Sequence, residues 1–170
     1  MAKTGLGNKP AGPRHERVAH LPDKRRTEVQ ERSTIRILLV DDHPLVREGL
    51  KRILTSMVGV IVVGEAATGE EAVARARDLA PNLVIMDLSL PALSGIEATR
   101  LIKKDLPDTQ VLALTMHAEQ IYVRGALTAG ASGYIVKDSR PSDLVEAIEA
   151  VHRGEQYLRL SGAPNTSRQP

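Results

Sequence analysis

Five short aliphatic runs, separated by segments with helical spacing, constrain the fold of this chain more than any other sequence feature. The runs are apolar at consecutive rather than alternate positions, which is typical of strands buried on both faces of a parallel sheet. They lie at residues 35–40, 60–63, 83–86, 111–114 and 134–136. A helix-like segment follows each run, and right-handed crossovers then place helices on both faces of the sheet. The sequence therefore predicts a doubly wound α/β fold of five βα units.

Helix start and stop residues support this alternation. Pro44 and Pro141 stand where a proline is tolerated, at the first position of a helix. The segments 68–71 and 94–97 both read S/T-x-x-E, the pattern of a capping box. Gly130 is placed to end the fourth predicted helix.

The two ends of the chain differ in composition from its centre. Residues 1–34 contain eight Lys and Arg residues against four Asp and Glu residues and show no sustained apolar period. We predict a disordered basic extension there, because such a segment cannot bury enough surface to offset its ordering entropy. A single domain is predicted over residues 35–154. Residues 155–170 are rich in Ser, Gly, Pro and Asn and are predicted to be a tail or the start of a linker.

Composition excludes several classes of site. The chain has no Cys, so disulfides, thiolate metal sites and cysteine nucleophiles are absent. Only 2% of its residues are aromatic, and the core must therefore be aliphatic. No stretch has the length and hydrophobicity of a membrane span, and the N-terminus lacks the apolar segment of a signal peptide. We predict a cytoplasmic protein that does not contact a membrane.

Polar side chains follow four of the five predicted strands. They are Asp41, Asp42, Asp87, Thr115 and Lys137. An Asp after a strand is by itself a common turn residue. In a doubly wound sheet, however, functional groups gather at the carboxyl ends of the strands. We therefore expect three carboxylates, one hydroxyl and one ammonium to share one edge of the sheet.

Three carboxylates at one edge would repel one another unless positive charge compensates them. The ammonium of Lys137 supplies one such charge, and a hard divalent cation would supply more. Mg²⁺ suits such a site because it prefers oxygen ligands and commonly shares a phosphate oxygen with carboxylates. His43 has the chemistry of a metal ligand, but we interpret it as an exposed residue at the start of a helix.

Four segments carry a resemblance to a known family. They are "LLVDDHPLVREGL", "VIMDLSLPALSGIEATRLIK", "LALTMH" and "AGASGYIVKDS". Together they resemble the receiver domain of bacterial two-component response regulators, particularly the NarL/LuxR type, over about residues 35–153. The resemblance implies a flavodoxin-like fold with five parallel strands in the order 2-1-3-4-5.

The resemblance also implies a role for each residue at the sheet edge. Asp87 would accept a phosphoryl group from a sensor histidine kinase. Asp42 and Asp87 would bind Mg²⁺ directly, Asp41 would bind it through water, and the backbone carbonyl of Ser89 would be a further ligand.

The remaining roles concern catalysis and signalling. Lys137 would pair with the carboxylate and then with the phosphoryl oxygens, and Thr115 would offer its hydroxyl. Tyr134 matches the aromatic residue that turns inward when Thr115 moves, although a core tyrosine is an equally simple interpretation. A homodimer could use the first and fifth helices, or the fourth helix, fifth strand and fifth helix.

Two other functions remain open alternatives. A pseudo-receiver would act as an interaction module without being phosphorylated, but it would be expected to lose one of the site residues. A phosphatase of haloacid-dehalogenase type needs a second acid two residues after its nucleophile, where this chain has Ser89. Relatives of the NarL/LuxR type continue into a helix-turn-helix domain, and we expect no DNA-binding domain within this chain.

Overall fold

The computed structural model describes residues 34–160, in which strands and helices alternate. The elements are β1 (Ile35–Val40), α2 (Pro44–Thr55), β2 (Val60–Ala66), α3 (Gly69–Leu79), β3 (Leu83–Asp87), α4 (Gly95–Asp105), β4 (Gln110–Thr115), α5 (Gln120–Ala129), β5 (Gly133–Val136), α6 (Pro141–His152) and β6 (Tyr157–Arg159). The five predicted βα units are confirmed, and one further strand follows them.

The strands form one parallel sheet in the order β2-β1-β3-β4-β5-β6. The first five strands have the predicted order, but the predicted number of five strands is wrong. The sixth strand pairs with β5 and belongs to the segment that we predicted to be a tail. It is retained in the sheet because Tyr157, only 1% exposed, packs into the core beside α6.

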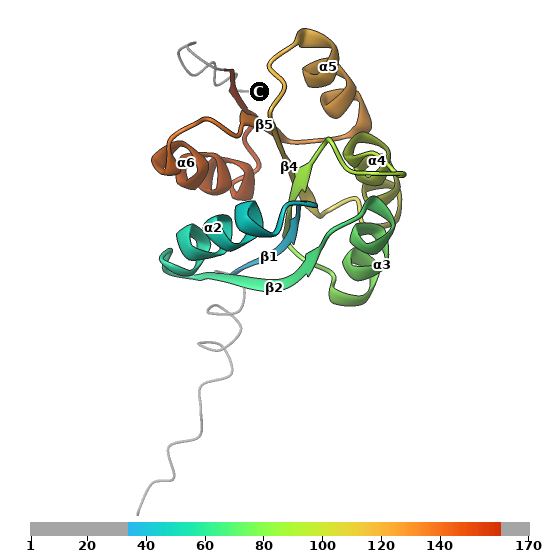
Figure 1. Ribbon diagram of the computed structural model, residues 1–170. Coiled ribbons are helices and arrows are strands. Elements are labelled where there is room, and N and C mark those ends of the chain that lie inside the picture. Colours follow the sequence, from blue (N-terminus) through green and yellow to red (C-terminus); the bar gives the residue numbers. More distant parts are fainter. Residues whose placement is uncertain (1–33, 161–170) are drawn as a thin grey trace, which may run out of the picture.

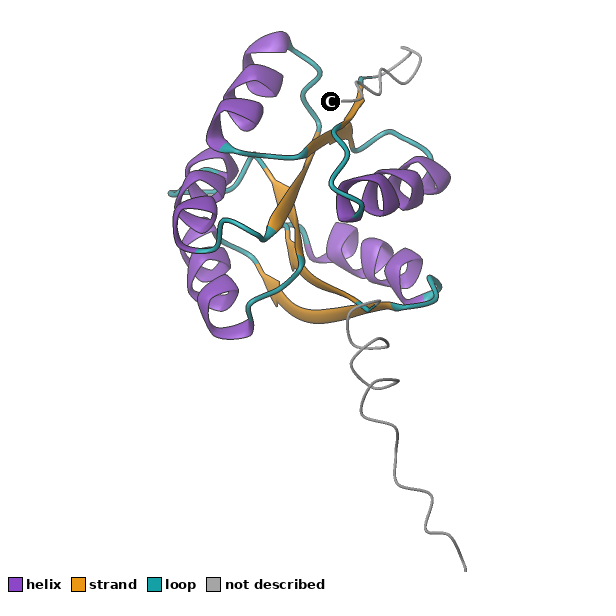
Figure 2. Ribbon diagram, turned by 180° about the vertical axis from the view of Figure 1, so that it is seen from behind, coloured by secondary structure: helices purple, strands orange, loops and turns teal. Residues whose placement is uncertain are grey.

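Helices cover both faces of the sheet, as Figures 1 and 2 show. α3, α4 and α5 lie on one face, and α2 and α6 lie on the other. Successive strand residues point to opposite faces, so Leu38 joins the core beneath the first group of helices and Leu39 joins the other core. Because both faces are covered, every residue of β3 is buried. This burial explains why the aliphatic runs are continuous.

Local signals determine where the helices begin. Pro44 and Pro141 occupy the first turns of α2 and α6. At the start of α3, Thr68 Oγ1 accepts a hydrogen bond from the Glu71 backbone N–H at 3.2 Å. Ser94 caps α4 in the same way. These helix starts limit the loops that follow the strands, and Asp41, Asp42 and Lys137 lie in such loops.

The ends of the chain lie outside the described residues. Of the predicted basic extension at 1–34, only Thr34 is described, and residues 161–170 are also not described. The domain limits therefore remain predictions. Within residues 34–160, no helix combines the length and the hydrophobicity that crossing a membrane requires. A cytoplasmic location remains a prediction.

Candidate functional site

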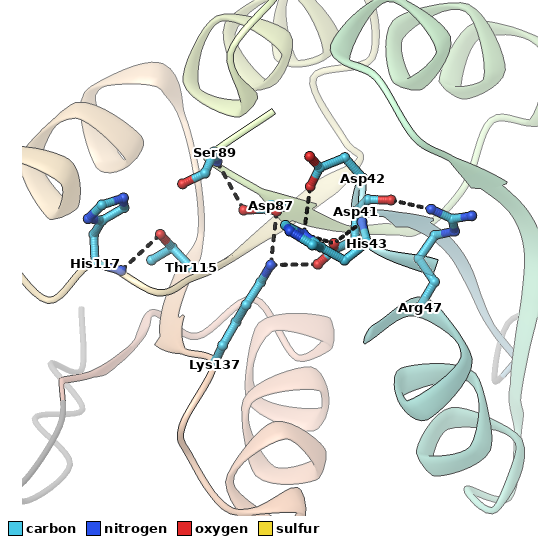
Figure 3. A network of polar contacts seen from close by, with 9 residues as sticks. All are labelled: Asp41, Asp42, His43, Arg47, Asp87, Ser89, Thr115, His117 and Lys137. Carbon is cyan, nitrogen blue, oxygen red and sulfur yellow. Dashed lines mark hydrogen bonds and ion pairs between the residues drawn. The ribbon is translucent and has the colours of Figure 1, made fainter. Parts of the chain in front are cut away.

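The carboxyl ends of four strands bring the polar residues together at one edge of the sheet (Figure 3). Asp41 and Asp42 follow β1, Asp87 ends β3, Thr115 ends β4, and Lys137 follows β5. Neighbouring strands end at the same level, because Val40 is the register partner of Met86 and Leu114 is that of Asp87. The juxtaposition is therefore a consequence of the sheet register.

Lys137 connects two of the carboxylates. Its Nζ lies 2.6 Å from Asp41 Oδ2 and 2.9 Å from Asp87 Oδ2. The side chain is only 10% exposed, and each of the two aspartates is only 1% exposed. Burial alone would lower the pKa of Lys137, but its hydrogen bonds to Asp41 and Asp87 outweigh burial and raise the pKa above its usual range. The ammonium is therefore retained as a charged group.

The loop after β3 fixes the orientation of Asp87. The backbone N–H of Ser89 donates to Asp87 Oδ1 at 2.9 Å, so one carboxylate oxygen faces the loop and the other faces Lys137. Leu88 and Leu90 are buried on either side of Ser89, and the Gly95 N–H donates to the Leu88 carbonyl at 3.1 Å. The chain turn at Asp87 is thus held by both side-chain packing and a backbone hydrogen bond.

The acidic groups fit a hard cation. Ligand atoms of Asp41, Asp42, His43 and Asp87 all lie within 4.8 Å of one another. Among the described residues, Asp42 Oδ1 is buried and accepts no hydrogen bond, with His43 Nδ1 2.8 Å from it, whereas Asp41 Oδ2 is paired with Lys137 at 2.6 Å. Buried carboxylate oxygens without hydrogen bonds are costly, and a metal ion would compensate them. Asp42 is 31% exposed, which leaves an approach to the group from solvent.

Two residues near the carboxylates have contacts that sequence reasoning did not assign. His43 is exposed and precedes α2, as interpreted, but its Nδ1 also lies 2.8 Å from Asp42 Oδ1. Arg47, one turn into α2, donates through Nη1 to the Asp41 backbone carbonyl at 2.6 Å. The only sequence signal for Arg47 is its spacing of one helical turn from the start of the helix at Pro44.

On the other side of the site, Thr115 and Tyr134 are linked through one residue. Both side chains are completely buried. The backbone N–H of His117 donates to Thr115 Oγ1 at 3.2 Å, and the backbone carbonyl of His117 accepts from the Tyr134 hydroxyl at 2.6 Å. The His117 ring stacks on Tyr122 of α5 with a centroid separation of 4.3 Å. The sequence suggested no such link, because it depends on backbone groups.

Comparison with known proteins is decisive for the family. Residues 37–149 match the family described as the response regulator receiver domain, a region that contains all five polar residues of the sheet edge. The chain belongs to the response regulator receiver family. Family members are signalling proteins whose acidic pocket binds Mg²⁺, and this receiver domain has the corresponding acidic cluster.

The relatives place this receiver domain close to the NarL/LuxR type. It is 44% identical over 124 residues to response regulator UvrY of Escherichia coli strain K12, a match that covers 73% of this chain and 57% of UvrY. The chain thus spans little more than half the length of that relative. A LuxR-family two-component response regulator from an Aurantimonas species has 46% identity and a TM-score of 0.72, covering 76% of this chain and 91% of that structure.

A third comparison concerns an isolated receiver domain. The isolated receiver domain of RcsB from Salmonella enterica serovar Typhimurium was solved in the presence of the phosphomimetic BeF₃⁻. It is 27% identical to this chain with a TM-score of 0.69, and the match covers 74% of this chain and 94% of that structure. The fold described above is therefore the flavodoxin-like fold of response regulator receivers.

Proposed function

We propose that Asp87 accepts a phosphoryl group from the phosphohistidine of a sensor histidine kinase. A carboxylate oxygen of Asp87 attacks phosphorus, the N–P bond of the phosphohistidine breaks, and the imidazole leaves with the bonding electron pair. The product is an acyl phosphate on Asp87. The observation that carries this proposal is the 2.9 Å ion pair between Lys137 Nζ and Asp87 Oδ2, because it holds a cation beside the carboxylate that receives the negative group.

Mg²⁺ would be held by the acidic residues on the side of Asp87 away from Thr115. Asp42 and Asp87 would bind it directly, Asp41 through water, and the Ser89 carbonyl would be a further ligand. The fit is supported by the buried Asp42 Oδ1, which accepts no hydrogen bond from a described residue, and by the grouping of the Asp41, Asp42 and Asp87 carboxylates within 4.8 Å. When bound, the ion supplies charge neutralisation between the carboxylates and the incoming phosphoryl oxygens.

The protein's own side chains position the phosphoryl group and neutralise its negative charge, and they do not exchange protons with it. Lys137 and the Thr115 hydroxyl would contact the phosphoryl oxygens once Asp87 is modified. The chain therefore promotes only its own phosphorylation and dephosphorylation and does not turn over a separate substrate. This agrees with its place in a family of signalling proteins.

Phosphorylation would change the state of the domain through Thr115 and Tyr134. The new group adds about −1.5 to −2 of charge beside Thr115. Movement of Thr115 would act on the His117 backbone, to which the Tyr134 hydroxyl is bound. The equilibrium between two existing conformations would shift. The homodimer faces, formed by α2 with α6 or by α5, β5 and α6, remain proposals.

Two alternatives make different predictions. A pseudo-receiver would keep the fold without accepting a phosphoryl group, yet this chain retains the carboxylates and the lysine at the sheet edge. A phosphatase of haloacid-dehalogenase type is disfavoured because residue 89, two positions after Asp87, is a serine.

Incubation with Mg²⁺ and acetyl phosphate tests the proposal. We expect one hydroxylamine-labile phosphoryl group per chain, detected by intact mass, and no labelling of Asp87→Asn. Asp108→Asn is the matched control, because Asp108 is an exposed aspartate in the loop before β4. Labelling of Asp87→Asn at the rate of the unmodified chain would overturn the assignment, and an unlabelled native chain would favour the pseudo-receiver.

Mg²⁺ should also stabilise the domain without any phosphodonor. A ligand that binds only the folded state at ten times its dissociation constant adds about 1.4 kcal/mol, which corresponds to about 3–6 °C in Tm for a domain of this size. We expect this rise in a thermal scan of the unmodified chain and its loss in Asp42→Ala. An equal rise in Asp42→Ala would contradict the proposed ligand set.

A further inference from the structure

The sixth strand, β6, changes the environment of β5. In a five-stranded sheet, β5 would be an edge strand with one free side. Here β6 lies beside it at the end of the sheet (Figure 1), with Tyr134 in register with Leu158 and Gly133 in register with Tyr157. Among the described residues, β6 is therefore the edge strand at this end of the sheet, and it separates β5 from that edge.

Alternate side chains of β6 attach it to both neighbouring helices. On the α6 side, Tyr157 is buried with its hydroxyl 3.4 Å from Glu146, and Arg159 forms a 3.2 Å ion pair with the buried Asp143. On the α5 side, Leu158 and Leu160 pack against the same apolar cluster that contains Tyr134. β6 is thus fixed to α6 by polar contacts and to the Tyr134 core by apolar ones.

Tyr134 is enclosed by this arrangement. Its side chain has no exposed surface, and its hydroxyl is bound to the His117 carbonyl. Burial, together with the nearby charge of Glu119, raises the pKa of the Tyr134 hydroxyl to about 12. An aromatic ring on an edge strand can reach solvent around that edge, but here Leu158 of β6 and Leu160, the residue that follows β6, pack against the cluster that contains Tyr134.

We propose that β6 holds Tyr134 in the core, and that the Tyr134 ring leaves the core only when β6 detaches from β5. The phosphorylation site and β6 are then coupled through Thr115, His117, Tyr134 and Leu158. The coupling is reciprocal, so a change at β6 alters the position of Tyr134 as much as the reverse. The coupling between β6 and Tyr134 does not depend on the proposed function. Its role in regulating the phosphorylation site does rest on that function.

The three tyrosines of the chain provide a direct test. Tyr122 lies on α5, Tyr134 on β5 and Tyr157 on β6, so fluorotyrosine labelling reports all three elements by ¹⁹F NMR. In the full chain with a soluble paramagnetic chelate, we expect little broadening of Tyr134 and Tyr157. In Leu158→Ser/Leu160→Ser, we expect both signals to broaden at least as much as that of the partly exposed Tyr122.

Two further variants keep the test independent of a general loss of structure. Arg159→Ala removes the ion pair between β6 and Asp143, which lies on the face of the sheet opposite Tyr134. If the Tyr157 signal broadens in this variant, we expect the Tyr134 signal to broaden in proportion. Glu155→Ser, at an exposed residue before β6, should change neither signal. A Tyr134 signal that stays protected in the double variant, or Tyr157 broadening without Tyr134 broadening, overturns the proposal. Because no phosphodonor is present, failure of phosphorylation would leave these outcomes unchanged.

Discussion

Replacement of Lys137 with Met is expected to lower the free energy of unfolding by about 3 kcal/mol in the absence of Mg²⁺. The substitution keeps the apolar stem and removes the ammonium that lies 2.6 Å from Asp41 and 2.9 Å from Asp87. Both carboxylates are buried, so they would be left without their cationic partner. Urea unfolding followed by circular dichroism at neutral pH measures the loss.

The matched control is Lys51→Met. Lys51 forms a 2.7 Å ion pair with Glu65, but its side chain is 37% exposed, so we expect a much smaller loss of stability than for Lys137→Met. The effect of pH gives a second check. Because the folded-state pKa of Lys137 is raised, its contribution is fully present below the unfolded value of about 10.4 and is lost as pH rises through the higher folded value. Similar losses for the two lysine variants would contradict the importance of the buried pair.

Replacement of Gly95 with Ala is expected to destabilise the domain by about 3 kcal/mol and to reduce phosphoryl uptake. A Cβ at Gly95 would lie 2.0 Å from the Asp87 carbonyl oxygen and 2.7 Å from Leu88 Cα. Both are backbone atoms of the turn that orients Asp87, so a side-chain movement cannot relieve the overlap. Thermal unfolding and acetyl phosphate labelling would report the two consequences.

Gly49→Ala is the matched control in another helix. Gly49 is an exposed residue within α2, and a Cβ there would meet no atom within 4 Å. Alanine is the better helix former, so this variant should gain about 0.5–1 kcal/mol. If Gly95→Ala lowers the stability and Gly49→Ala raises it, the loss of stability arises from the turn at Asp87. Equal stability of Gly95→Ala and the native chain would show that the turn tolerates displacement.

Much of this architecture could be predicted from residue patterns, because strands that are covered on both faces are apolar at consecutive positions. Continuous aliphatic runs such as that of β3 are the result of burial on both faces. The polar residues that follow four of the five runs then fall at the carboxyl edge by topology alone. Asp41, Asp87 and Lys137 could therefore be brought together without knowledge of any distance.

The sixth strand could not be predicted in the same way. β6 is three residues long, and only Tyr157 in it is fully buried. Its place in the sheet depends on pairing with β5 and on the ion pair of Arg159 with Asp143, both of which are non-local. The His117 link between Thr115 and Tyr134 was missed for a similar reason, since it uses backbone atoms that have no sequence signature.

The most direct test of the central claim is the location of the phosphoryl group. Borohydride reduces an aspartyl phosphate to homoserine, and peptide mass spectrometry then identifies the modified position in the chain treated with acetyl phosphate and Mg²⁺. We expect homoserine at position 87 and at no other aspartate. Homoserine at Asp41 or Asp42 with none at position 87 would contradict the assignment of Asp87 as the phosphoryl acceptor.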